Sequence, residues 1–115
     1  MVLYCEFKLF IFDFIASVRK NGGLKPISLE KRIEYLSSLI KKVPYWTRGH
    51  LLYAEAYTKL DISNSSDYAR SRSAIRVSAT AVLSLIKKKP NEEYRSRARY
   101  FIELLSSSTT ESPLR

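Results

Sequence analysis

The sequence predicts an all-α protein, and three observations lead to that prediction. Only 3 glycines and 4 prolines occur in 115 residues, which is too few for an all-β fold with many tight turns. Apolar residues recur at helical spacing over long uninterrupted stretches. The segments LIKKVP at 39–44 and LIKKKP at 85–90 are near-copies of each other. We therefore expect about five helices in a single helical-repeat domain over residues 1–105.

The near-copies define an internal repeat with a shift of 46 residues. This shift aligns Leu29 with Ile75, Leu36 with Val82, and Pro44 with Pro90. Residues 28–44 and 74–90 should then be equivalent helices that run in the same direction, with another helix between them.

The first helix is predicted over residues 2–20, and Gly22 follows as its C-cap. Its charged residues argue against both a secretory signal and a membrane span. Four polar residues fall within a narrow arc that we expect to face water, namely Glu6, Asp13, Ser17 and Lys20. The rest of the helix is mostly apolar, so burial should come from its own domain and from another chain in a homo-oligomer or larger assembly.

Ser28 is the expected N-cap of a second helix over residues 29–42, which Pro44 terminates. Its predicted buried stripe is Leu29, Ile33, Leu36, Leu39, Ile40 and Val43. The third helix, within residues 45–60, is apolar on two faces, which is typical of a central helix packed on both sides.

A polar segment at 61–67 separates the third helix from a fourth over about residues 67–88. The fourth helix has an apolar stripe of Ile75, Ala79, Val82 and Ile86. Asn91 should cap a fifth helix that ends near residue 105 and buries Ala98, Phe101 and Leu105. Residues 106–115 are rich in Ser and Thr and are predicted to be a disordered tail.

The third and fourth helices resemble the tetratricopeptide repeat family, which stacks antiparallel helix pairs. The resemblance rests on the spacing of His50, Tyr53, Ala54, Tyr57, Ala74, Ser78, Ala81 and Pro90. A HEAT-like repeat stays open, because its period of about 40–47 residues is nearer to the period seen here. The resemblance implies a non-enzymatic scaffold that holds a protein or peptide segment in a groove. The implied groove residues are Arg48, Leu51, Glu55, Thr58 and Lys59.

Residues suited to catalysis, metal binding or cofactor binding are sparse. The single His50 and single Cys5 are far apart in the sequence and occupy helical positions typical of packing, so we expect no enzymatic activity and no metal site. Gly22 and Gly23 lack the strand and lysine of a phosphate-binding loop, and no cofactor is expected. A lone thiol points to a reducing compartment, the cytoplasm.

The chain carries a net charge of +9, shared between about +5 in residues 1–60 and about +4 in residues 61–115. Two lysine runs should lie along one rim of the domain, because they end helices that run in the same direction. They are Lys41, Lys42, Lys87, Lys88 and Lys89. Such a rim could bind anions, so the alternative function is binding of RNA or of an anionic membrane surface.

Overall fold

Five α-helices make up the described part of the chain in this computed structural model, and no strand occurs in that part. The structure describes the backbone of residues 1–60 and 65–111, and side chains within 1–60 and 68–106. The helices are α1 (Val2–Asn21), α2 (Leu29–Lys42), α3 (Thr47–Lys59), α4 (Ser65–Leu85) and α5 (Glu92–Glu111). The predicted all-α class and the number of helices are confirmed.

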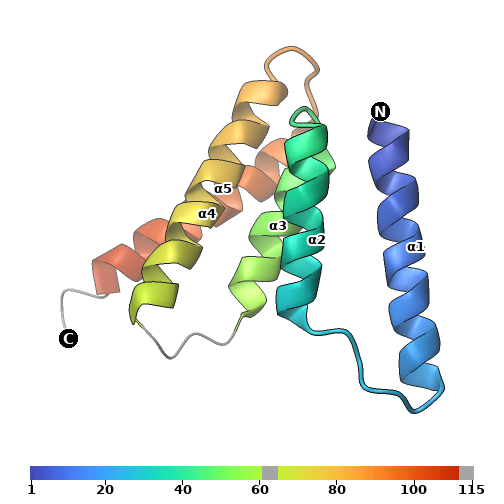
Figure 1. Cartoon of the computed structure of the whole chain (residues 1–115). Helices are drawn as coiled ribbons and strands as arrows, with labels where there is room; N and C mark the ends of the chain where they lie inside the picture. The colour runs from blue at the N-terminus through green and yellow to red at the C-terminus, as the bar shows by residue number, and fades with distance from the viewer. Residues whose placement is uncertain (61–64, 112–115) are drawn as a thin grey trace.

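Successive helices alternate in direction, and α2 and α4 run the same way on either side of α3 (Figure 1). This is the relation predicted for residues 28–44 and 74–90. The helix α1 stands at one edge beside α2, whereas α5 lies on the opposite side and crosses behind α4 (Figure 1). The start of α1 and the end of α5 are therefore far apart in the fold (Figure 1).

Two of the predicted caps hold the starts of their helices. The Ser28 hydroxyl accepts a hydrogen bond from the Lys31 amide at 3.2 Å, and the Asn91 side-chain oxygen accepts one from the Tyr94 amide at 3.0 Å. The turn after α1 passes through Gly23 at φ +77°, a conformation that glycine adopts without the steric cost of a side chain.

The end of α5 corrects one prediction. The helix continues to Glu111 instead of ending near 105. A helix that is already nucleated extends at low cost even through residues of modest propensity. The remaining tail residues, 112–115, and residues 61–64 of the predicted polar segment lie outside the described residues.

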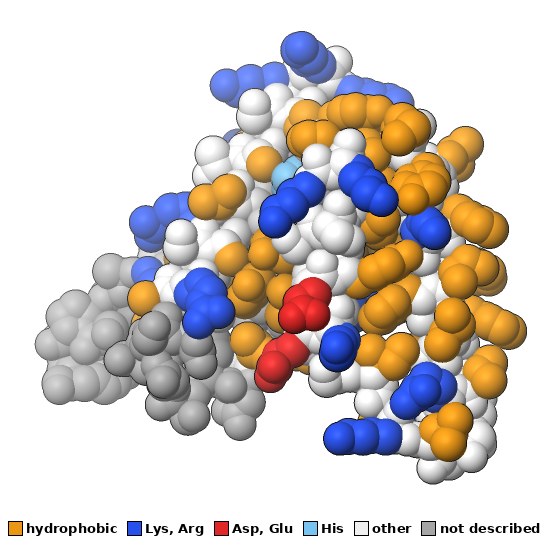
Figure 2. Space-filling model, viewed as in Figure 1, with side chains coloured by type: hydrophobic (Ala, Val, Ile, Leu, Met, Phe, Trp, Pro, Cys, Tyr) orange, Lys and Arg blue, Asp and Glu red, His pale blue; other side chains and the backbone are white. Residues whose placement is uncertain are grey.

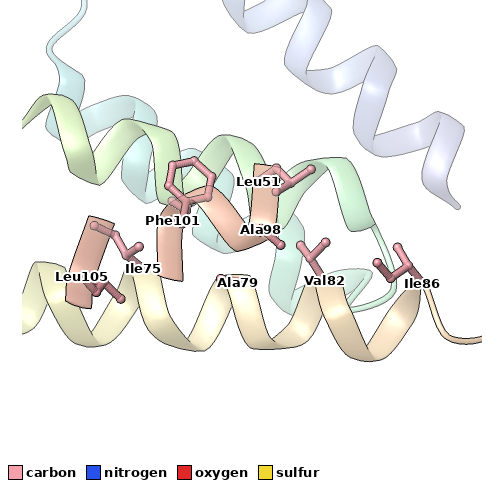
Figure 3. Packing of buried hydrophobic residues seen from close by; sticks show 9 residues of the cluster. Leu51, Ile75, Ala79, Val82, Ile86, Ala98, Phe101 and Leu105 are labelled. Carbon is pink, nitrogen blue, oxygen red and sulfur yellow. The ribbon is translucent and has the colours of Figure 1, made fainter. Parts of the chain in front are cut away.

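The buried side chains form two clusters that meet at α3. The first joins α3 to α4 and α5 (Figure 3), and its members are Leu51, Ala54, Ile75, Ala79, Val82, Ile86, Ala98, Phe101 and Leu105. The second joins α1, α2 and the start of α3, through Cys5, Leu9, Leu36, Leu39, Val43 and Trp46. Because α3 or the residue preceding it contributes to both clusters, the prediction of a central helix is confirmed.

The tyrosines of α3 lie between these clusters. Tyr53 packs against the second cluster and Tyr57 against the first, with their rings 5.1 Å apart in an edge-to-face arrangement. Burial, together with the hydrogen bond to Tyr53, raises the pKa of Tyr57 to about 12. Both rings are partly buried, as expected for a helix with neighbours on two sides.

The domain is a flat slab with extents of 46 × 38 × 21 Å. Its radius of gyration is 15.4 Å, whereas a compact domain of this length has about 13 Å. The slab is about two helix diameters thick. The edge helix α1 is consequently covered by the rest of the chain on one side only.

Candidate interaction surface

The outward side of α1 is an apolar surface that the rest of the chain does not cover. Seven large apolar side chains on it are between 36% and 82% exposed. We call this set the α1 outer face: Leu3, Phe7, Phe10, Ile11, Phe14, Ile15 and Val18. Hydrophobic side chains line the edge of the molecule formed by α1 in Figure 2. Positions spaced three and four residues apart share one side of a helix, which is why these residues form a continuous surface.

The aromatic rings give this face its continuity. Phe10 and Phe14 stack with ring centroids 6.5 Å apart and their planes inclined by 21°. Phe7 lies one helical turn before them and is 63% exposed. A row of exposed rings of this kind is unusual on a monomer, whose exposed apolar residues are normally scattered.

The opposite side of α1 attaches the helix to α2. Cys5 and Leu9 are buried against α2, and the Cys5 thiol donates to the Leu39 carbonyl over 3.9 Å. The ring of Phe12 stacks on that of Tyr35 at 4.7 Å. The Tyr35 hydroxyl donates to the carbonyl of Lys8, also on α1, at 3.4 Å. These contacts show that α1 is apolar on two sides and uses only one of them within the chain.

A carboxylate of α1 binds the start of α3. One oxygen of Glu6 accepts a hydrogen bond from the Trp46 indole at 2.8 Å, and the other pairs with Arg48 at 2.5 Å. The Trp46 ring is fully buried, so Glu6 provides the partner that its N–H requires. Glu6 thereby fixes α1 to the junction between α2 and α3.

A second carboxylate repeats this arrangement further along the helix, where Asp13 pairs with Arg32 of α2. The prediction that this stripe faces water is confirmed for Asp13, whose side chain is 48% exposed although it pairs with Arg32. Glu6 is half-buried, because it binds Trp46 and Arg48. Ser17 and Lys20 of the same stripe are exposed, as expected. The charged partners on α2 and α3 decide which side of α1 turns inward.

An open hollow of about 680 Å³ lies between α1, the connection at 22–28 and α2. Phe12 and Tyr35 form part of its wall, and Arg19 and Lys31 lie at its polar side. Its presence shows that the part of α1 after Asp13 stands apart from α2. The attachment of α1 is strongest near Cys5, Glu6 and Leu9.

The predicted groove on α3 is contradicted at its central residue. Leu51 is 0% exposed and belongs to the cluster with α4 and α5, so it cannot contact a ligand in this structure. Its side chain is covered because α5 folds back across α3. The sequence pattern did not indicate that α5 would be a neighbour of α3.

The other four predicted groove residues bind one another or other helices. Arg48 pairs with Glu6, as described above. Glu55 pairs with Lys59 and with Arg97 of α5, each at 3.6 Å. The Thr58 hydroxyl donates to the Glu55 carbonyl at 2.6 Å. The structure thus brings these residues together as an ion-paired surface around α3 and not as a groove with an apolar anchor.

The lysine rim residues are all exposed. Lys41 and Lys42 end α2, and Lys87, Lys88 and Lys89 follow the end of α4. Since α2 and α4 end on the same side of the molecule (Figure 1), the two runs lie at one end of the slab. The Lys42 ammonium also lies 6.0 Å from the centre of the Tyr4 ring, which places this rim beside the N-terminal end of α1.

The two residues considered for catalysis have structural partners. His50 lies with its Nε2 atom 2.7 Å from the Pro44 carbonyl, to which it donates. Burial raises the pKa of the Cys5 thiol, which disfavours the reactive thiolate. Within the described residues no three His, Cys, Asp or Glu side chains cluster in a way that could hold a metal ion.

No helix in the described ranges has both the length and the apolar composition required to cross a membrane.

Comparison with known proteins gives no relative from which a function could be transferred. No protein-family model matches the chain, and neither a characterised protein nor a solved structure is significantly similar to it.

Proposed function

We propose that this protein is a non-enzymatic interaction module, and that it binds other proteins through the α1 outer face. The observation that carries the proposal is the contrast between the two sides of α1. One side is fixed by Cys5, Leu9 and Glu6, while the other exposes seven large apolar side chains. The partner that best fits this face presents an apolar helical surface of its own, because the side-chain ridges of one helix can pack into the grooves of another.

This proposal retains the scaffold function that the repeat resemblance implies but moves its site. The implied groove depended on Leu51 as an apolar anchor, and Leu51 is part of the core. The α1 outer face supplies exposed phenylalanine rings instead, and aromatic residues are enriched in the cores of protein interfaces.

Cross-linking in cells followed by mass spectrometry tests this function. Wild type should give cross-links from residues 1–25 to a protein surface, and Phe14→Asp should remove them. Tyr100→Asp is the matched control, since Tyr100 is 59% exposed and Phe14 is 57% exposed. Cross-links that survive Phe14→Asp, or that Tyr100→Asp removes equally, would contradict the proposal.

A second candidate function rests on the lysine rim, whose five lysines are exposed at one end of the slab. Such a rim would bind RNA or an anionic membrane surface by releasing counterions, and the affinity would fall steeply with salt. Substituting Lys87, Lys88 and Lys89 by Gln should then reduce binding to a single-stranded RNA at low salt. Binding through the α1 outer face should be insensitive to both the substitution and the salt concentration.

A further inference from the structure

We infer that the α1 outer face binds the same face of a second copy of this chain, forming a twofold-symmetric dimer in which the two α1 helices lie antiparallel. The inference rests on the proposed function and names its partner. It is carried by three properties of the face: its area, the order of its residues and the position of the charges around it.

The area of the face suits a dimer of ordinary size. If a fully exposed large side chain presents about 200 Å², the seven residues together expose about 800 Å². The largest apolar surface of a typical monomer is about 300–600 Å². Two copies would bury at most about 1,600 Å² in total, which lies within the range of about 1,200–2,000 Å² for specific interfaces.

The order of six of the seven residues makes the face self-complementary. A twofold axis between Phe10 and Ile11 places these two residues opposite each other. It also places Phe7 opposite Phe14, and Leu3 opposite Val18. Because α1 is 20 residues long, the antiparallel helices would meet over about 30 Å. A twofold interface requires such self-complementarity. If one residue contacts a second residue in the other copy, that second residue contacts the first in the other copy as well.

The charges favour the antiparallel arrangement. The α1 outer face contains no charged residue, and the carboxylates beside it, Glu6 and Asp13, are already paired with Arg48 and Arg32. These carboxylates would therefore bring no unpaired charge into the dimer, and the cation on the other border of the face, Lys8, lies against the Tyr4 ring. The Tyr4 ring of α1 adjoins Lys42 in the lysine rim. An antiparallel pair separates the two rims by about the length of α1, well beyond the Debye length of about 8 Å, whereas a parallel pair would bring them side by side.

A membrane surface fits this face less well than a second copy. Helices that lie on anionic membranes carry lysines and arginines along the polar borders of the apolar face. Here Lys8 stands on one border, but the other border carries the carboxylates Glu6 and Asp13, whose charges are used within the chain. Phe10 lies one helical turn before Asp13, so a membrane against this face would bring that carboxylate close to the lipid phosphates.

Analytical ultracentrifugation of the full chain tests the dimer. Wild type should sediment at twice the chain mass of 13.3 kDa. Phe10→Asp should raise the dissociation constant at least roughly 100-fold, as expected for a central interface residue. Val77→Asp on α4 is the matched control, because Val77 and Phe10 are both 65% exposed. Far-UV circular dichroism checks that each variant remains helical.

Cysteine cross-linking tests the orientation in a Cys5→Ser background. Ile11→Cys lies next to the axis, so a short bifunctional thiol reagent should link two copies. Leu3→Cys should not be linked, because its counterpart would lie about 22 Å away along an antiparallel helix. Efficient linking through Leu3→Cys together with none through Ile11→Cys would overturn the antiparallel arrangement.

Other outcomes separate this inference from the proposed function. A monomeric wild type at hundreds of micromolar overturns the dimer, as does a dimer that Phe10→Asp leaves intact. If the monomeric chain still gives cross-links to a different protein that Phe14→Asp removes, the proposed function stands and only the partner is wrong. Phe10-dependent binding to vesicles containing anionic lipid, in place of dimerisation, overturns both.

Discussion

Gly49 is required by the ring of Trp46. A Cβ atom built on Gly49 would lie 2.1 Å from a carbon of the Trp46 ring and 2.5 and 2.7 Å from two others. This ring is fully buried and its indole N–H is bound to Glu6, so it has little freedom to move. The absence of a side chain at Gly49 therefore allows α3 to begin directly against the ring.

We expect Gly49→Ala to destabilise the protein by about 1–3 kcal/mol, as overpacked core substitutions do. The sign of this change in the free energy of unfolding is informative, because replacing glycine by alanine at an open helical position stabilises a protein by up to about 1 kcal/mol. Urea unfolding followed by fluorescence measures the effect, since Trp46 is the single tryptophan of the chain. Ser96→Ala, at an exposed position of α5, is the control and should be neutral or slightly stabilising. A stabilised Gly49→Ala variant would show that the ring moves aside.

Leu51 illustrates what a residue pattern on a single helix leaves open. The prediction of two apolar faces for the third helix placed Leu51 between them, on a third face assumed to meet solvent or a ligand. That face is covered because α5 folds back, and the cluster of Leu51 with Ala98 and Phe101 depends on contacts distant in sequence. Periodicity identifies which residues of one helix share a side, but not which other helix lies against that side.

At the scale of helices, the sequence was most informative where the apolar stripe is narrow. In α2 the stripe of Ile33, Leu36 and Leu39 is buried as predicted, and the helix occupies 29–42 as predicted. In α1 both sides are apolar, so periodicity could not decide which side turns inward. The choice is made by Glu6 and Asp13, whose cationic partners lie on α3 and α2.

We expect Glu6→Gln to loosen α1, since glutamine keeps an acceptor for the Trp46 indole but loses the ion pair with Arg48. Both side chains of this pair are partly exposed, so solvent screening limits the effect to about 1 kcal/mol, or roughly fivefold in the population of detached α1. The alkylation rate of Cys5 by iodoacetamide measures that population, because the thiol is buried against α2 when α1 is attached.

The control for this experiment is Asp13→Asn, whose carboxylate is 48% exposed and lies further from Cys5. It should change the alkylation rate less than Glu6→Gln does. Each rate is compared at the same pH, because burial raises the pKa of the thiol and lowers the fraction of reactive thiolate in the attached state. Equal rates in wild type and Glu6→Gln would show that Glu6 does not hold α1.

At the scale of the whole molecule, the side of the slab formed by α1 differs from the side formed by α5. Over residues 92–106, where the side chains of α5 are described, its outer surface is polar apart from Tyr100, and includes Glu92, Arg99 and Glu103. The outer surface of α1 is apolar. In stacked helical proteins a terminal helix with a polar outer side closes the array, whereas an apolar side requires a neighbour. The fold is therefore closed at α5 and open at α1.

This asymmetry also determines which part of the molecule opens first. The cluster that joins α3, α4 and α5 contains nine buried residues, whereas α1 contributes only Cys5 and Leu9 to the other cluster. Segments with few buried contacts open locally without global unfolding. We therefore expect amides of residues 6–20 to exchange at least about tenfold faster than those of 75–85 when the protein is dilute.

Hydrogen exchange at two protein concentrations tests two properties of α1 together, its local opening and the burial of its outer face by a second copy. Antiparallel pairing would bury the α1 outer face, so protection of residues 6–20 should rise with protein concentration while that of residues 75–85 stays constant. In Phe10→Asp the α1 amides should exchange at the fast rate at both concentrations, and in Val77→Asp they should behave as in wild type. Concentration-independent protection of α1 in the wild type would mean that its single buried side is sufficient to hold it, and that the seven exposed residues are not covered by a second copy.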